Sequence, residues 1–186
     1  IVMTAMTSGL TSSVYQQYRG GTIVVSQDKD APEGAIESAE RTLSATSGVT
    51  TIKHTAQWPA DAQTDATRGQ LYVSPLAAKP FADIDLSAGT KPTADDQITI
   101  PEHTALTLSL KVGDTVRVRA GFTEGDYRTL TIVGTTRSNT ISMGVPASYV
   151  TDGGFSSIFG ATASGQFIVA TSGADADSNA NPPSAT

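Results

Sequence analysis

The chain contains no cysteine among its 186 residues. This absence excludes disulfide bonds, thiolate zinc sites and a cysteine nucleophile, although it does not identify a cellular compartment. Histidine is scarce as well, since only His54 and His103 are present. A catalytic or metal-binding histidine needs partners at a defined geometry. His54 falls in a strand pattern and His103 near a predicted helix start, so we interpret both as structural residues.

Charged side chains are few, and basic ones are fewer than acidic ones. The chain has 12 Lys and Arg against 18 Asp and Glu, which gives a net charge of −6. Nucleic-acid binding depends on clustered Lys and Arg that neutralise phosphates, and no such cluster is present. Arg117, Arg119 and Arg128 are expected to line one face of a hairpin. We interpret them as a solvated strand face, with an anionic partner as the alternative.

Motifs for catalysis and for ion binding are missing. The chain has no GxSxG nucleophile elbow and no GxxxxGK[ST] phosphate loop. Residues 28–30 and 175–179 are faintly similar to calcium loops, but neither has Gly at loop position six or Glu at position twelve. We interpret the first as a helix cap and the second as part of a solvated tail. We therefore expect no catalytic centre, no cofactor and no metal.

No stretch of the sequence is long and apolar enough to cross a bilayer. The chain begins Ile-Val-Met-Thr without a signal peptide, and we expect it to be a piece of a larger protein. Residues 1–18 are predicted to be helical. Their apolar residues either continue a membrane helix or form an ordinary amphipathic first helix.

The next part of the chain has the rhythm of a βαβ unit. Residues 22–26 and 49–55 are rich in β-branched residues and predict two strands. Helical spacing between them predicts a helix over about 30–46, with Asp30 as its cap and Pro32 in its first turn. A right-handed crossover is expected if the two strands are parallel.

The most informative stretch follows later, over residues 105–134. Val116 and Val118 alternate with arginines, and a second alternating run covers 128–134, so the pattern predicts two strands. The glycine-containing connection 121–126 is a plausible hairpin loop. A short helix is predicted within 101–110. Gly113 is predicted to adopt a positive φ in the turn before the first of these strands.

Several shorter segments complete the prediction. Residues 57–69 are interpreted as a loop and 146–150 as one helical turn. Trp58, Tyr72 and Phe81 are expected to fill the core, with a surface binding role as the alternative. The remaining strand or extended segments are 70–74, 97–100, 140–145 and 165–171.

Together these elements predict an α+β fold with two lobes. A mixed, βαβ-containing lobe would comprise 1–78 plus 163–173, an inserted β-rich lobe 79–162, and a flexible tail 174–186. Strand 166–170 should pair with 22–26 or 50–54 and not extend the hairpin. The reason is that Phe167 and Val169 need an apolar face that a small sheet under one helix leaves incomplete.

The stretch 86–150 resembles the extracytoplasmic domain of FtsX/MacB-like ABC-transporter permeases. The resemblance rests on an ordered set of short motifs, including Leu-Ser-Leu-Lys-Val-Gly-Asp at 108–114, Ile-Val-Gly at 132–134 and Val-Pro at 145–146. Two departures are visible: Gln97 stands where the family usually has Glu, and Ser109 where it has Gly. The residues taken as the structural signature are Gly89, Pro92, Gly113, Asp114, Gly134 and Pro146.

The resemblance implies a non-enzymatic domain on the extracytoplasmic side of the bacterial cell membrane. It would lie between the first two transmembrane helices of a permease, with the ATPase as a separate subunit or domain and a homodimer in the full transporter. Movement driven by ATP would then expel a substrate, pass lipoproteins onward or activate a cell-wall hydrolase. The alternative is a secreted or surface-anchored binding module of the adhesin or carbohydrate-binding type. A hydrolase with scattered carboxylates ranks last.

Overall fold

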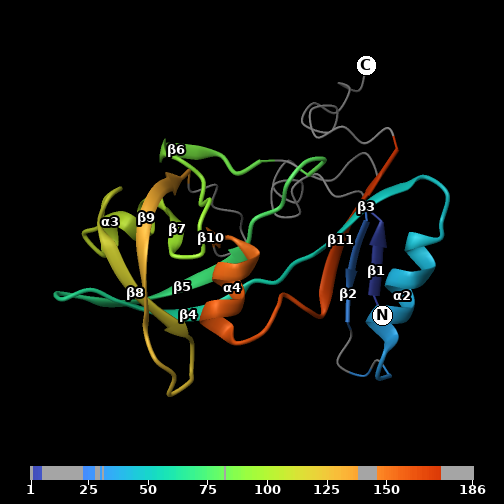
Figure 1. The fold of residues 1–186 in the computed structure, drawn as a ribbon, viewed down its shortest axis with the longest axis horizontal. Coiled ribbons are helices and arrows are strands. Elements are labelled where there is room, and N and C mark those ends of the chain that lie inside the picture. The colour runs from blue at the N-terminus through green and yellow to red at the C-terminus, as the bar shows by residue number, and fades with distance from the viewer. Residues whose placement is uncertain are drawn as a thin grey trace. The chain divides into compact units, whose positions relative to one another are not determined.

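The computed structural model describes residues 2–5, 23–27, 30, 32–81, 83–137 and 146–172 (Figure 1). Its strands and few helices confirm the predicted α+β class. The chain divides into two compact units. Unit 1 comprises Ile1–Thr55, Ala77–Asp83 and Ser164–Thr186, and unit 2 comprises Ala56–Leu76 and Ile84–Ala163.

Unit 1 is built on a four-stranded sheet with the order β1-β2-β11-β3. The strands are β1 (Val2–Ala5), β2 (Ile23–Ser26), β3 (Val49–His54) and β11 (Gln166–Thr171). β11 lies between β2 and β3 and runs antiparallel to both, so β2 and β3 run parallel to each other. The pairing predicted for the last strand is therefore confirmed.

Helix α2 (Ala35–Ser44) connects β2 to β3 and covers one face of this sheet. Ile36 and Leu43 pack in one cluster with Phe167 and Val169. The predicted cap is wrong, because the helix begins after Gly34, which turns the chain at φ 77° without a side-chain cap. The helix predicted for 1–18 is wrong at Val2–Ala5, which pairs antiparallel with β2, and the rest of that range lies outside the described residues.

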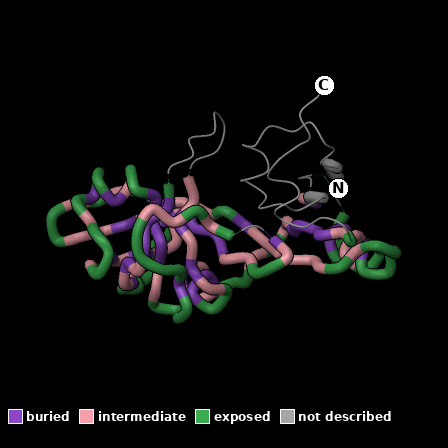
Figure 2. The backbone as a smooth tube through the Cα atoms, turned by 90° about the horizontal axis from the view of Figure 1, so that it is seen from above, coloured by how far each residue is buried: buried purple, intermediate pink, exposed green. Residues whose placement is uncertain are grey.

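The opposite face of β11 is covered by a segment from the middle of the chain. Phe81, only 3% exposed, packs with Ile168 and Ala170. Figure 2 shows buried positions in both units. The core interpretation therefore holds for Phe81, and unit 1 needs residues 77–83 to complete its core.

Unit 2 contains a seven-stranded sheet with the order β6-β9-β7-β10-β5-β4-β8. β8 also pairs with β9, so all the strands except β6 form a closed ring, and β6 pairs with the end of β9. Closure leaves the ring without free edges. The strands are β4 (Trp58–Gln63), β5 (Arg68–Pro75), β6 (Leu86–Gly89), β7 (Gln97–Pro101), β8 (Thr115–Ala120), β9 (Arg128–Thr136) and β10 (Ser148–Val150).

The barrel interior is apolar, and two helices pack against it. Val116 and Val118 face the core as their alternation predicted. Ala105 of α3 (Glu102–Thr107) joins this core, as does Phe155 of α4 (Asp152–Phe159). The ring of Trp58 lies 5.1 Å from that of Phe155, so Trp58 is also part of the packing.

Two segments of unit 2 also differ from the sequence prediction. The supposed loop 57–69 contains β4, and β4 pairs with β5 and β8 in the barrel. Residues 56–76 therefore belong to unit 2 and not to the mixed lobe of 1–78 that was expected. The predicted helical turn at 146–150 is instead strand β10, because it pairs with β5 and β7. The segment 140–145 and the tail 174–186 lie outside the described residues.

Candidate functional site

The two histidines lie in different settings. Nε2 of His54 on β3 lies 3.1 Å from Oε1 of Glu40 on α2, and both side chains are partly exposed. His103 is exposed in the first turn of α3. Among the described residues, no group of His, Asp and Glu side chains is arranged to hold a metal ion.

Gly89 and Gly134 of the signature lie opposite each other where β6 pairs antiparallel with β9. A Cβ on Gly89 would overlap the carbonyl oxygen of Val133, and a Cβ on Gly134 would overlap that of Thr90. Gly89 also has a φ of 75°, a backbone region that side chains resist. These two glycines therefore permit a close approach of two backbones. They shape the barrel and do not form a reactive site.

Gly113 and Asp114 form the turn that leads into β8. Gly113 has a φ of 98°, which confirms the prediction. A carboxylate oxygen of Asp114 accepts a bond from the Lys111 N–H at 3.0 Å. The Gly113 N–H donates to the carbonyl of Ile132 on β9 at 2.8 Å. The turn is thus tied to the neighbouring strand.

Replacing Gly113 with valine should lower the free energy of unfolding by about 1–3 kcal/mol, because a β-branched residue strongly resists a positive φ. A Cβ there would meet no atom within 4 Å, so the cost is backbone strain alone. Urea unfolding measures it. Gly113→Asn should recover much of the loss, since Asn tolerates this conformation. Equal stability of the Val and Asn variants would argue against strain at this turn.

Pro92 lies in the turn before β7, and Gln97 is the first residue of β7. Pro92 is buried. Oε1 of Gln97 accepts hydrogen bonds from the backbone N–H groups of Thr93 at 2.9 Å and Ala94 at 3.3 Å. A Glu side chain would offer the same acceptor oxygen, so Gln97 in place of Glu preserves the hydrogen bonds of the turn. Pro146 is half-buried just before β10.

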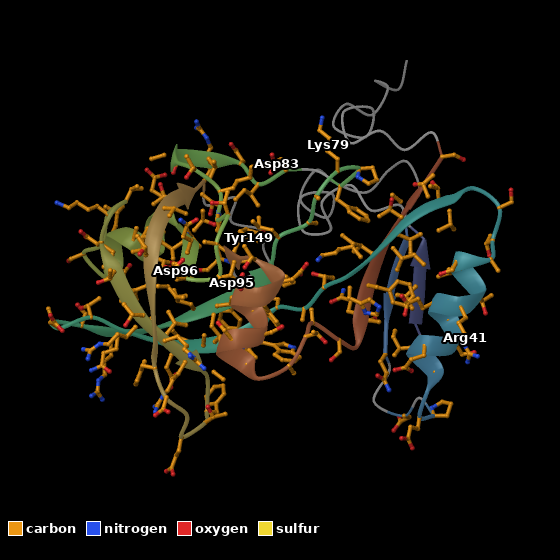
Figure 3. The ribbon with its side chains drawn as sticks, viewed as in Figure 1. Arg41, Lys79, Asp83, Asp95, Asp96 and Tyr149 are labelled. Atoms are coloured by element: carbon orange, nitrogen blue, oxygen red, sulfur yellow. The ribbon has the colours of Figure 1, made fainter. Side chains whose placement is uncertain are left out.

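A polar contact that the sequence did not predict anchors helix α4. Oγ1 of Thr151 accepts a hydrogen bond from the Gly154 N–H at 2.9 Å and caps the helix, while it donates to a carboxylate oxygen of Asp95. Figure 3 shows Asp95 beside α4. A Cβ on Gly153 would overlap the Asp95 carboxylate. The signal that could have revealed the helix is the Thr151-Asp152 pair, which is typical of an N-cap and first turn, whereas the two glycines that follow have low helix propensity.

Arg117 and Arg119 share the solvent face of the barrel, as predicted. Arg119 Nε lies 3.1 Å from Oδ2 of Asp61, directly opposite on β4, and its guanidinium stacks 4.7 Å from the ring centre of Tyr127. Arg128 does not join them, because its cross-strand partner is Val118, whose side chain points into the core. The prediction that three arginines share one face of the hairpin is therefore wrong for Arg128.

Two exposed apolar side chains stand out in unit 2. Phe122, in the β8–β9 connection, is 85% exposed and has a φ of 62°. Leu106 on α3 is 74% exposed. Neither was singled out from the sequence, because solvent exposure is not visible in a short loop or helix pattern.

Across the described residues, no helix has both the length and the apolar character to span a bilayer. No protein-family model matches the chain, and no curated protein sequence matches it. The solved structures that are similar in fold include two domains of ABC-type transporters. The extracellular domain of the noncanonic ABC-type transporter YknZ from Gram-positive bacteria matches with 17% identity and a TM-score of 0.57, over 84% of this chain and 86% of that one. The periplasmic region of MacB from Actinobacillus actinomycetemcomitans matches with 13% identity and a TM-score of 0.53, over 81% and 73%.

The chain shares the fold of these transporter ectodomains. The resemblance noted at 86–150 is thus confirmed at the level of fold, and it extends to most of the chain. Both neighbours are, by their descriptions, domains outside the cytoplasmic membrane. At such low sequence identity, the similarity establishes the fold alone and does not establish the activity.

Proposed function

We propose that the chain is the extracytoplasmic domain of an ABC-transporter permease. In this role it couples ATP hydrolysis by a cytoplasmic ATPase subunit or domain to substrate export or to an extracellular partner. The observation that carries the proposal is the shared fold with the YknZ domain over most of both chains. The ordered signature supports it, since Gly89, Gly113 and Gly134 each occupy a position that requires glycine geometry.

The way the chain connects the two units fits a domain that transmits movement. The chain passes from one unit to the other near residues 55, 76, 83 and 163. A displacement imposed on unit 1 would therefore reach unit 2 through several covalent connections. The full transporter would contain two copies of the permease, and the flanking transmembrane helices would deliver the displacement.

The absence of cysteine makes location directly testable. Ser47 is exposed and Val118 is fully buried. In the parent protein, Ser47→Cys should react with a membrane-impermeant maleimide on intact cells, because the domain is outside the membrane. Val118→Cys should react only after denaturation. Labelling of Ser47→Cys only after cell lysis would contradict an extracytoplasmic location.

A secreted or surface-anchored binding module is the second candidate function. Labelling on intact cells does not distinguish it from a permease domain, because both lie outside the membrane. Carbonate extraction separates the two proposals. A permease domain stays with the membrane through its transmembrane helices and co-purifies with an ATPase. A module that is released by carbonate, or that co-purifies with no ATPase, would favour a secreted or surface-anchored binder.

A further inference from the structure

The tip of the β8–β9 hairpin, residues 121–126, presents an aromatic side chain to solvent. Phe122 is 85% exposed, the largest exposed fraction among the large apolar residues of the described chain. Its φ of 62° places it in the left-handed region, which residues with a side chain rarely adopt. Neither its exposure nor its backbone conformation favours folding. The left-handed backbone of Phe122, more than its exposure, therefore calls for an explanation outside the folded unit.

The base of the tip holds Phe122 in this outward position. The Gly121 N–H donates to the Pro59 carbonyl on β4 at 2.9 Å. The Thr123 hydroxyl donates to the Ala120 carbonyl at 2.8 Å. These bonds hold the backbone on both sides of Phe122, so little backbone ordering is left to occur on binding. A preorganised backbone that presents an aromatic residue lowers the entropic cost of binding.

The connection 121–126 itself carries two acidic side chains and no basic one, and the exposed Arg128 follows at the start of β9. Glu124 and Asp126 are both exposed in the same short connection. The nearby Arg119 is already paired with Asp61 and stacked on Tyr127. The tip therefore combines one apolar anchor with two carboxylates.

We propose that the hairpin tip is a docking site for a protein partner that presents an apolar surface edged with Lys or Arg. Phe122 enters the apolar surface, while Glu124 and Asp126 face the basic edge. An anionic lipid surface would repel the same two carboxylates. A second copy of the tip would bring like charges together, so neither is the favoured occupant.

This inference deepens the proposed function, because it names the chemistry of an extracellular partner. The two fail separately. Peptide binding by the purified chain tests the tip alone, whereas maleimide labelling and carbonate extraction test the permease assignment alone.

The probe is a dye-labelled amphipathic helical peptide made of Leu and Lys, compared with a matched peptide in which Glu replaces Lys. The purified chain should bind the Leu/Lys peptide in fluorescence anisotropy and prefer it to the Leu/Glu peptide. Phe122→Ala should weaken this binding about tenfold or more, as expected for the loss of an aromatic anchor. The double variant Glu124→Lys with Asp126→Lys should reverse the preference between the two peptides.

Leu106→Ala is the matched control, because Leu106 is also an exposed apolar residue of unit 2. It should leave peptide binding unchanged. Equal binding by wild type and Phe122→Ala, or an equal loss in Leu106→Ala, would overturn the proposal. So would Phe122-dependent binding to phosphatidylcholine–phosphatidylglycerol vesicles in place of the peptide, or Phe122-dependent self-association in sedimentation.

Discussion

Replacing Gly89 with alanine is expected to lower the free energy of unfolding of unit 2 by about 2–5 kcal/mol. Part of this cost, about 1–2 kcal/mol, comes from placing a side chain at a positive φ. The rest comes from overlap with the Val133 carbonyl oxygen and from a Cβ that would lie only 2.7 Å from the Gly134 Cα. Both are backbone atoms of a paired strand, so relaxation is costly and about 1–3 kcal/mol is added.

Gly160→Ala separates these two contributions. Gly160 has a similar φ of 68° and lies in the same unit, and a Cβ at this position would meet no atom within 4 Å. The substitution should therefore cost only about 1–2 kcal/mol. Trp58 is the only tryptophan and packs in unit 2, so its fluorescence follows unfolding of that unit. Equal losses of unfolding free energy in the two variants would show that the backbones of β6 and β9 do not approach closely at Gly89.

Replacing Phe81 with alanine is expected to destabilise unit 1 by about 3–5 kcal/mol, the usual cost of removing a buried Phe side chain. Phe81 is 3% exposed and packs on Ile168 and Ala170 of β11. Without it, one face of this central strand is opened to water. Amide hydrogen exchange at 167–170 should accelerate in proportion, because those amides exchange through opening of the sheet.

Phe122→Ala is the control for this prediction. It is the same substitution at an 85% exposed position and should change the stability by less than about 0.5 kcal/mol. The Trp58 signal should respond to Phe81→Ala far less than the exchange at β11 does. If exchange at 167–170 stays unchanged in Phe81→Ala, residues 77–83 do not complete the core of unit 1.

The signature residues act through backbone geometry. Gly89 and Gly134 allow the backbones of two paired strands to approach closely. Gly113 and Asp114 form a turn that is hydrogen-bonded to β9. None of these positions brings together a nucleophile, a base or metal ligands.

The sequence alone was sufficient for several elements whose structure depends on near neighbours, although not for the cap of helix α2. The β8–β9 hairpin, the positive φ of Gly113 and helix α2 follow from alternation, glycine placement and helical spacing over a few residues. Pairing of β11 with β2 or β3 was also predicted, because Phe167 and Val169 need an apolar face that a small sheet leaves incomplete, and β11 pairs with both strands.

Only the tertiary structure decided the elements whose partners lie far away in the chain. The sequence of β4 has the pattern of a polar loop, and the segment is a strand because it pairs with β5 and β8. β10 is a strand because it pairs with β5 and β7. Helix α4 forms despite two glycines because Thr151 caps it, and the Thr151 hydroxyl is held by Asp95, which lies 56 residues earlier in the chain. Local propensities differ by less than such tertiary contacts contribute, so a sequence window cannot reveal which pairing will stabilise it.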